Sequence, residues 1–318
     1  MMPFNRTALA RHLGCAIAVL LVLTGCTSSD QPPQLPSSTD HAALSSVVLS
    51  ANGANFLRDI TGHAWDDGGR EAGDLFAWIP RDAQSQDQAV AVRAGETAHA
   101  IASFLTDERE SLTDAPANPE LWQSFSAALV PYLGAAVGNG SDVAGFAPLD
   151  DLQSSMTRTV GLFLAMTKDT QASRALVNDA TSRAASDEEA FADAVTTDPT
   201  PATIAAEAER TLLPAARLRS VIATSAHVAD PDSEQPSSAP AQTRVAFEVA
   251  SRTARVGDPT IDPKFFGSNG RLLPPDQIPS KDWSVYDSQL SVYLASPPAV
   301  NEAISRFGRV YQRIVGQA

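Results

Sequence analysis

The residues best suited to bind a metal lie in a short acidic segment that contains one histidine. His63 is flanked by Asp59, Asp66 and Asp67, and imidazole and carboxylate groups at short spacing are ligand types that transition metals accept. One histidine without a second His or Cys nearby rarely makes a tight site. Because Asp66 and Asp67 are followed by two glycines, the segment favours an acidic turn. We therefore predict a turn here, with no metal and no cofactor.

Two pairs of adjacent carboxylates have the chemistry of a general acid and base. Asp150-Asp151 and Glu188-Glu189 each precede an apolar helical pattern, where acidic side chains cap helix N-termini and favour the positive end of the dipole. We interpret both pairs as capping residues. The chain has no Gly-x-Ser-x-Gly elbow, no His-Glu-x-x-His and no phosphate loop, and Gly267 to Gly270 is typical of a turn. The sequence therefore predicts a protein that is not an enzyme.

The aromatic residues have a similar double interpretation. Four tryptophans, Trp65, Trp78, Trp122 and Trp283, would suit the lining of a ligand groove, but tryptophans at such positions are more often anchors of the core. His99 lies between two alanines in a helical pattern, without a partner for catalysis nearby in the sequence. We predict that the tryptophans are core anchors and that His99 is a helix-surface or half-buried residue.

A cysteine near the start of the chain has a more specific chemistry. An apolar run at 16–23 follows the basic residues Arg6 and Arg11; a permanent transmembrane helix needs roughly 20 apolar residues, whereas a secretory signal needs about 7–15. The run ends in Leu23-Thr24-Gly25-Cys26, which resembles the lipobox of bacterial lipoproteins. The cysteine sulfur takes a diacylglyceryl group, and small residues before it let the backbone enter the peptidase that cuts there.

The lipobox predicts that residues 1–25 are a lipoprotein signal peptide and that the mature chain begins at a lipidated Cys26. Two acyl chains, such as palmitate, give stable anchoring at about 0.8 kcal/mol per buried methylene. We expect a protein held on the extracytoplasmic face of the cell membrane. Since Cys15 leaves with the leader, the exported body has no disulfide and depends on packing alone.

Charge restricts the partners. The formal net charge is −14, and loss of Arg6 and Arg11 with the leader leaves 21 basic against 37 acidic residues. Such a body repels nucleic acid and anionic headgroups, so we predict no nucleic-acid partner. Few lysines, many arginines and abundant alanine indicate a gene of high GC content, as in actinobacteria.

Composition predicts the architecture. The chain is 43% hydrophobic but only 6% aromatic, which favours closely packed alanine-rich helices over sheets. We predict a mainly α protein, a multi-helix bundle or irregular helical array with Pro/Ser-rich linkers. Its predicted parts are a flexible tether at 26–40, a helical domain at 41–229, a disordered linker or loop at 230–241, and a C-terminal helical segment at 242–318 packed on the same core.

Periodic apolar residues locate individual helices. They predict helices over 90–105 and 300–315, and a third that begins at Pro119 after an Asn118 cap. Pro131 should kink this third helix or start a new one. Further expectations are a helix that ends at Pro80, a capping box at 186–189, one long helix from Thr200-Pro201 to Ile222, a short helix over 244–255 and an irregular stretch over 256–283.

Three segments carry a family resemblance. Residues 56–69 (FLRDITGHAWDDGG), 118–122 (NPELW) and 128–133 (ALVPYL) resemble the helical TPR-like region of mycobacterial and other actinobacterial secreted proteins. The resemblance covers roughly 45–230 and implies a helical fold and an exported setting, with no activity. Because no 34-residue repeat is present, a regular TPR solenoid is not expected.

These observations leave three classes of function. The first is a membrane-anchored, non-catalytic binding or scaffold module that binds a protein of the cell envelope. The alternative is a lipoprotein that carries a small molecule or lipid, which needs a pocket of roughly 300–1,000 Å³. The third is an envelope hydrolase or a toxin-related accessory factor, of which a hydrolase needs a convergent polar site.

Overall fold

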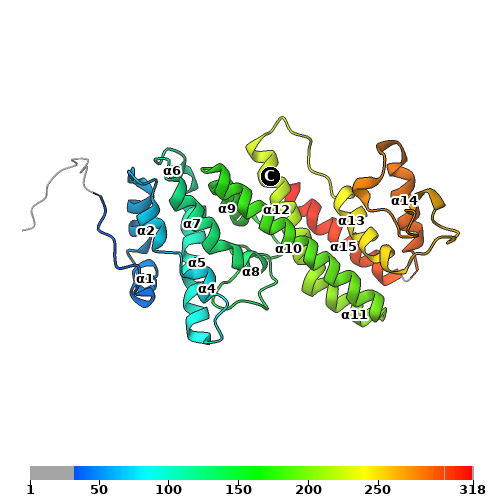
Figure 1. The fold of residues 1–318 in the computed structure, drawn as a ribbon, viewed down its shortest axis with the longest axis horizontal. Helices are drawn as coiled ribbons and strands as arrows, with labels where there is room; N and C mark the ends of the chain where they lie inside the picture. Colours follow the sequence, from blue (N-terminus) through cyan, green and yellow to red (C-terminus); the bar gives the residue numbers. More distant parts are fainter. Residues whose placement is uncertain (1–31, 297, 317–318) are drawn as a thin grey trace, which may run out of the picture. The chain divides into compact units, whose positions relative to one another are not determined.

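The computed structural model describes residues 32–296 and 298–316 of the 318-residue chain. From Pro33 onward the chain forms one compact unit, which consists of packed helices (Figure 1). Within the described ranges there is no strand, only an isolated antiparallel bridge between Phe266 and Leu272. The prediction of a mainly α helical array is confirmed.

The predicted leader lies outside the described residues, and so do Leu23, Thr24, Gly25 and Cys26 of the predicted lipobox. Among the helices that are described, none is long and apolar enough to cross a membrane. Residues 32–40 contain no helix, but Leu35 packs against the core. The side chain of Asp40 then caps the first helix by accepting a hydrogen bond from the Ala43 N–H at 2.9 Å.

The first half of the array consists of helices that pack around α5. In particular, α1, α4 and α9 contact α5, and α3 contacts α7. The elements are α1 His41–Val48, α2 Gly53–Gly62, α3 Arg70–Asp74, α4 Ile79–Asp82, α5 Gln88–Asp107, α6 Arg109–Thr113, α7 Pro119–Leu129, the 3-10 turn η1 Val130–Tyr132, and α8 Leu133–Ala136.

The second half is organised by α10, which contacts α7, α12 and α13. Figure 1 shows α10 beside α12, with α13 and α15 next to them. The elements are α9 Thr157–Met166, α10 Thr170–Thr197, α11 Pro201–Glu207, the π-helical turn η2 Ala208–Leu212, α12 Leu213–Ala229, α13 Ala239–Thr253, the 3-10 turns η3 Pro263–Phe265, η4 Pro275–Gln277 and η5 Ser280–Asp282, α14 Trp283–Tyr293, and α15 Pro298–Val315.

Several predicted elements are confirmed. The stripes at 90–105 and 300–315 belong to α5 and α15, and the irregular stretch before Trp283 contains only 3-10 turns. At Pro131 the chain leaves α7 through η1 and enters α8, because proline lacks the N–H that a continuing α-helix needs. The long helix from Pro201 is present, but it includes the π turn η2 directly before Pro214, which accommodates that proline.

Four boundaries differ from the predictions. Residues 186–189 lie inside the 28-residue helix α10, where alanine-rich flanks sustain the helix and no capping box exists. Pro80 opens α4 instead of ending a helix, and Pro240 lies in the first turn of α13, so that helix begins before the predicted 244. The non-helical segment therefore ends at Ser238. Helix α14 was not predicted, because its apolar residues surround the helix and make no stripe.

Asn118 occupies the predicted position before α7, but its role differs. Its side chain makes no capping bond. Its Oδ1 accepts from the Trp65 N–H at 3.2 Å, and its Nδ2 donates to the carbonyl oxygens of His63 at 2.8 Å and Thr61 at 3.4 Å. The side chain is fully buried. Asn118 thus fastens the segment after α2 to the start of α7.

Replacing Asn118 by alanine should lower the free energy of unfolding by about 1–3 kcal/mol, because buried backbone groups lose their partners. Urea unfolding followed by far-UV circular dichroism measures the loss. Asn55→Ala is the matched control, since Asn55 is exposed on α2 and bonds only Arg58. Equal losses in the two variants would contradict the assigned role.

Candidate functional site

The acidic segment around His63 folds as the predicted turn. Asp67 accepts hydrogen bonds from the backbone N–H groups of Glu71 at 2.8 Å, Gly69 at 2.9 Å and Arg70 at 3.2 Å. These bonds, that from Glu71 first, hold the pKa of Asp67 below its usual value. Across the described part of the chain, no group of three His, Cys, Asp or Glu is arranged to hold a metal.

In the first carboxylate pair, Asp150 caps a helix, as predicted, whereas the Asp151 side chain accepts a hydrogen bond from the Gln153 N–H in the loop at 2.8 Å. Asp150 accepts from the N–H groups of Arg158 at 3.0 Å and Thr159 at 2.8 Å, and from the Thr159 hydroxyl at 2.7 Å. It therefore satisfies the first turn of α9 from a loop several residues upstream. Both oxygens of this carboxylate are occupied by hydrogen bonds that stabilise the start of α9.

For the second pair, the capping interpretation is wrong. Glu188 lies in the middle of α10 and is 1% exposed. Its two oxygens bind Arg219 of α12 at 2.9 and 3.0 Å, and Arg244 of α13 lies 3.9 Å away. Burial raises the pKa of Glu188, against the lowering effect of both arginines. The sequence pattern missed this buried ion pair because its partners come from two distant helices.

The aromatic candidates are core residues, as predicted. Trp78 and Trp122 are buried, and Trp65 and Trp283 are partly buried against the core. His99 is half-buried on α5 with its ring edge against Phe146. These side chains pack in or against the core, and none of them lines the candidate site.

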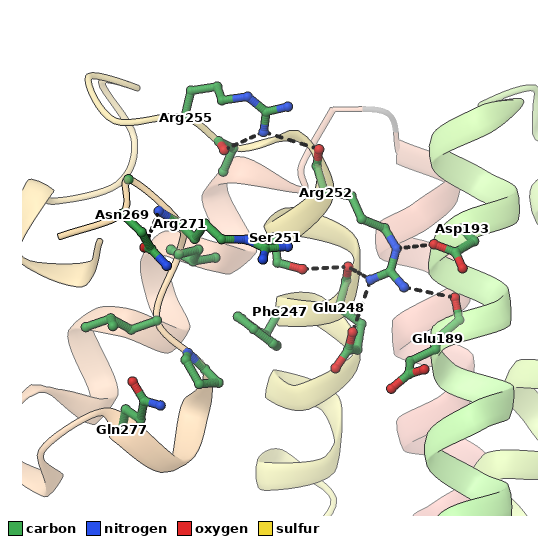
Figure 2. A pocket seen from close by; sticks show the side chains of 15 residues that line it. Glu189, Asp193, Phe247, Glu248, Ser251, Arg252, Arg255, Asn269, Arg271 and Gln277 are labelled. Atoms are coloured by element: carbon green, nitrogen blue, oxygen red, sulfur yellow. Dashed lines mark hydrogen bonds and ion pairs between the residues drawn. The ribbon is translucent and has the colours of Figure 1, made fainter. Parts of the chain in front are cut away.

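A large concave surface is a groove between α10, α13 and the loop at 269–277, which we call the C-terminal groove (Figure 2). Its volume is about 930 Å³, within the range of ligand-binding clefts. The half-buried ring of Phe247 and the side chain of Leu273 provide apolar surface. The rest of the lining is largely polar and charged.

Arg252 closes one wall of the groove. Its guanidinium binds the carboxylates of Asp193 and Glu248 and donates to the carbonyl oxygen of Glu189 at 3.3 Å. Figure 2 shows these bonds extending from α13 to α10. Because its donors are occupied by the protein, Arg252 positions the wall and is not available to a ligand.

Two other arginines on the groove have no such partners. Arg255 donates only to the backbone oxygens of Arg252 and Ala254, and the Arg271 side chain extends from the loop toward Ser251 (Figure 2). Within the described ranges, neither guanidinium has a carboxylate within 4.0 Å. On the α10 side, the carboxylate of Glu189 likewise has no cationic partner among the described side chains. The groove therefore has uncompensated charge of both signs.

The position of Arg271 follows from the turn predicted at 267–270. The Gly267 N–H donates to the Arg271 carbonyl at 2.8 Å, and the Asn269 side chain accepts from the Arg271 N–H at 3.0 Å. Gly270 has φ +72°, a left-handed conformation that glycine adopts without strain. The turn prediction is confirmed, but no sequence pattern indicates that the turn places an arginine on a groove.

The groove is suited to binding charged and apolar groups at once. Its lining contains neither His nor Cys, and the Ser251 hydroxyl donates to the Glu248 carbonyl oxygen at 3.1 Å instead of to a base. Arginines bind carboxylates through paired hydrogen bonds, and Glu189 would bind a cation. No family model, curated protein or solved structure matches this chain.

Proposed function

We propose that the protein is an exported lipoprotein, anchored through Cys26 to the extracytoplasmic face of the cell membrane, that binds a protein partner of the cell envelope without catalysing a reaction. The leader and the lipobox at 23–26 support the anchor. The actinobacterial origin that we propose rests on the composition and on the TPR-like resemblance of residues 45–230.

The observation that carries the binding role is the pair of unpaired guanidiniums, Arg255 and Arg271, on a groove that also has the free carboxylate of Glu189. A protein segment supplies both signs of charge together with apolar side chains. Arginine and aromatic residues are enriched at protein interfaces, and complementary charge selects the partner and speeds its association.

The anchor is tested separately from the groove. Intact mass spectrometry of the membrane-extracted protein should show cleavage before Cys26 and a diacylglyceryl mass on that residue, and Cys26→Ala should abolish both. Recovery of an unmodified protein from the medium would contradict the anchor and leave the groove untouched.

The groove is tested by site-specific photo-crosslinking in the native host. A photoreactive residue at Gln277, which lines the groove, should crosslink to one envelope protein, and the same probe at Gln171, exposed on α10, should not. The double variant Arg255→Glu/Arg271→Glu should reduce crosslinking at least tenfold, since charge-assisted bonds contribute about 1.5–3 kcal/mol each.

The control is Arg174→Glu, which reverses a charge at an exposed position of α10 outside the groove. It should leave the crosslink from Gln277 unchanged. Equal crosslinking from Gln277 and Gln171, or no effect of the double variant, would contradict the groove as the binding site.

A further inference from the structure

A second cavity lies where α9 meets the C-terminal ends of α5, α12 and α15, and we call it the α9 cavity. Its volume is about 480 Å³, a size that accommodates a small molecule. Residues from helices far apart in the sequence line it, and α9 contacts both α5 and α12. None of them belongs to the C-terminal groove.

One part of the lining is apolar and partly open. Val160 and Leu164 of α9, Val228 of α12 and Ile314 of α15 contribute aliphatic surface. Val228 is 42% exposed, which places it among the few large hydrophobic residues left open on the described part of the protein. An apolar ligand group in the cavity would remove this surface from water.

The space beside Gly161 is open as well. A Cβ atom added there would meet only the Cγ2 atom of Thr106, at an ordinary contact distance of 3.5 Å. A Cβ at position 161 therefore fits beside Thr106 without a clash. This glycine keeps the cavity wide.

The other part of the lining contains polar groups without partners. Thr224 is 2% exposed, and its hydroxyl has no hydrogen-bond partner among the described residues. The Nε of Arg158 is also buried without a partner there, although the same guanidinium binds Asp107 at 2.9 Å. Buried polar groups in native proteins are nearly always paired, and these two unpaired groups belong to residues on the polar side of the cavity.

The charge of the lining indicates which kind of ligand the cavity favours. Arg109 also lines the cavity and has no carboxylate within 4.0 Å in the described ranges. The positive charges of Arg109 and Arg158 therefore exceed the negative charge of Asp107. The carbonyl ends of α5 and α12 oppose an anion, but helix-end partial charges act only within the last turn and are weaker than a full guanidinium charge. The cavity therefore favours an anion in a protein of net charge −14.

We propose that the α9 cavity binds a small amphiphile with an apolar body and an anionic head, the class to which medium-chain fatty acids belong. The apolar body packs against Val160, Leu164 and Val228, and the carboxylate accepts hydrogen bonds from Arg158 and Arg109. The site is independent of the C-terminal groove, so its failure would leave the proposed partner binding intact.

Isothermal titration of the purified protein with decanoate, below its micellar concentration, tests the proposal. Decanoate should give a saturable single-site isotherm, and decanol and decyltrimethylammonium should bind at least tenfold more weakly, a difference of about 1.4 kcal/mol. Absence of a saturable isotherm would overturn the site. Equal binding of decanol would overturn the claim that the site recognises an anionic head.

Two variants locate the binding site. Gly161→Leu should abolish binding by filling the cavity. Gly62→Leu is the control and should leave binding unchanged, because Gly62 does not line the cavity and a Cβ there meets nothing within 4 Å. Val228→Glu, at an exposed position, should weaken decanoate at least tenfold by charge repulsion without disturbing the core. Wild-type affinity in both Gly161→Leu and Val228→Glu would overturn the assignment.

Discussion

Replacing Glu188 by alanine is expected to lower the free energy of unfolding by about 3–5 kcal/mol, because the variant leaves the half-buried Arg219 guanidinium without its counter-ion. Glu188 of α10 forms ion pairs with Arg219 of α12 and Arg244 of α13. Urea unfolding followed by far-UV circular dichroism at neutral pH gives the loss. Glu302→Ala should cost about 0–1 kcal/mol, since the Glu302–Arg309 pair is exposed on α15.

The double variant Glu188→Leu/Arg219→Met should recover most of the loss, because apolar groups of similar size often replace a buried pair without cost. If the double variant were as unstable as Glu188→Ala, the ion pair would not be the cause of the loss.

The pH dependence of stability gives a second readout of the same residue. Burial raises the pKa of Glu188 above its unfolded value, so between the two values the folded state binds more protons than the unfolded state. The contribution of Glu188 to stability is therefore full below the unfolded pKa and decreases as the pH rises through the folded pKa. Glu188→Gln should flatten this decrease, and an unchanged pH profile would contradict the raised pKa.

Trp122→Ala is the other substitution with a large expected effect, a loss of about 3–5 kcal/mol from the cavity that it leaves. Trp122 is 1% exposed on α7 and packs edge-on against Phe125, with ring centroids 6.0 Å apart. Urea unfolding followed by circular dichroism measures the loss without relying on tryptophan fluorescence. The control is Trp283→Ala, which removes a partly buried ring and should cost less. Equal losses would show that Trp122 is not a principal anchor.

The helices that the sequence predicted well are those whose packing is decided by their own periodicity. The stripes of α5 and α15 each face the core along their length, so local spacing was sufficient. Helix α14 escaped prediction because Val285 and Val292 are exposed while Tyr286 and Leu290 are buried, so apolar residues occupy both faces.

Residues whose roles depend on distant partners were misinterpreted or missed. Glu188 has the local pattern of a cap, yet its partner Arg219 is 31 residues away. Asn118 was placed correctly, but its bonds extend to residues more than 50 positions earlier in the chain. The C-terminal groove combines Glu189 with Arg255 and Arg271, and no local motif relates these positions.

The packing of α15 has a consequence for the order of folding. This helix, Pro298–Val315, makes its most extensive contact with α12 and also contacts α11 and α13. The helix that covers α12 is therefore the last described helix along the chain, and α12 can form before its cover docks. Exposed apolar surface on such an intermediate promotes aggregation. The apolar face of α12 remains open to such contacts until residues 298–315 dock on it.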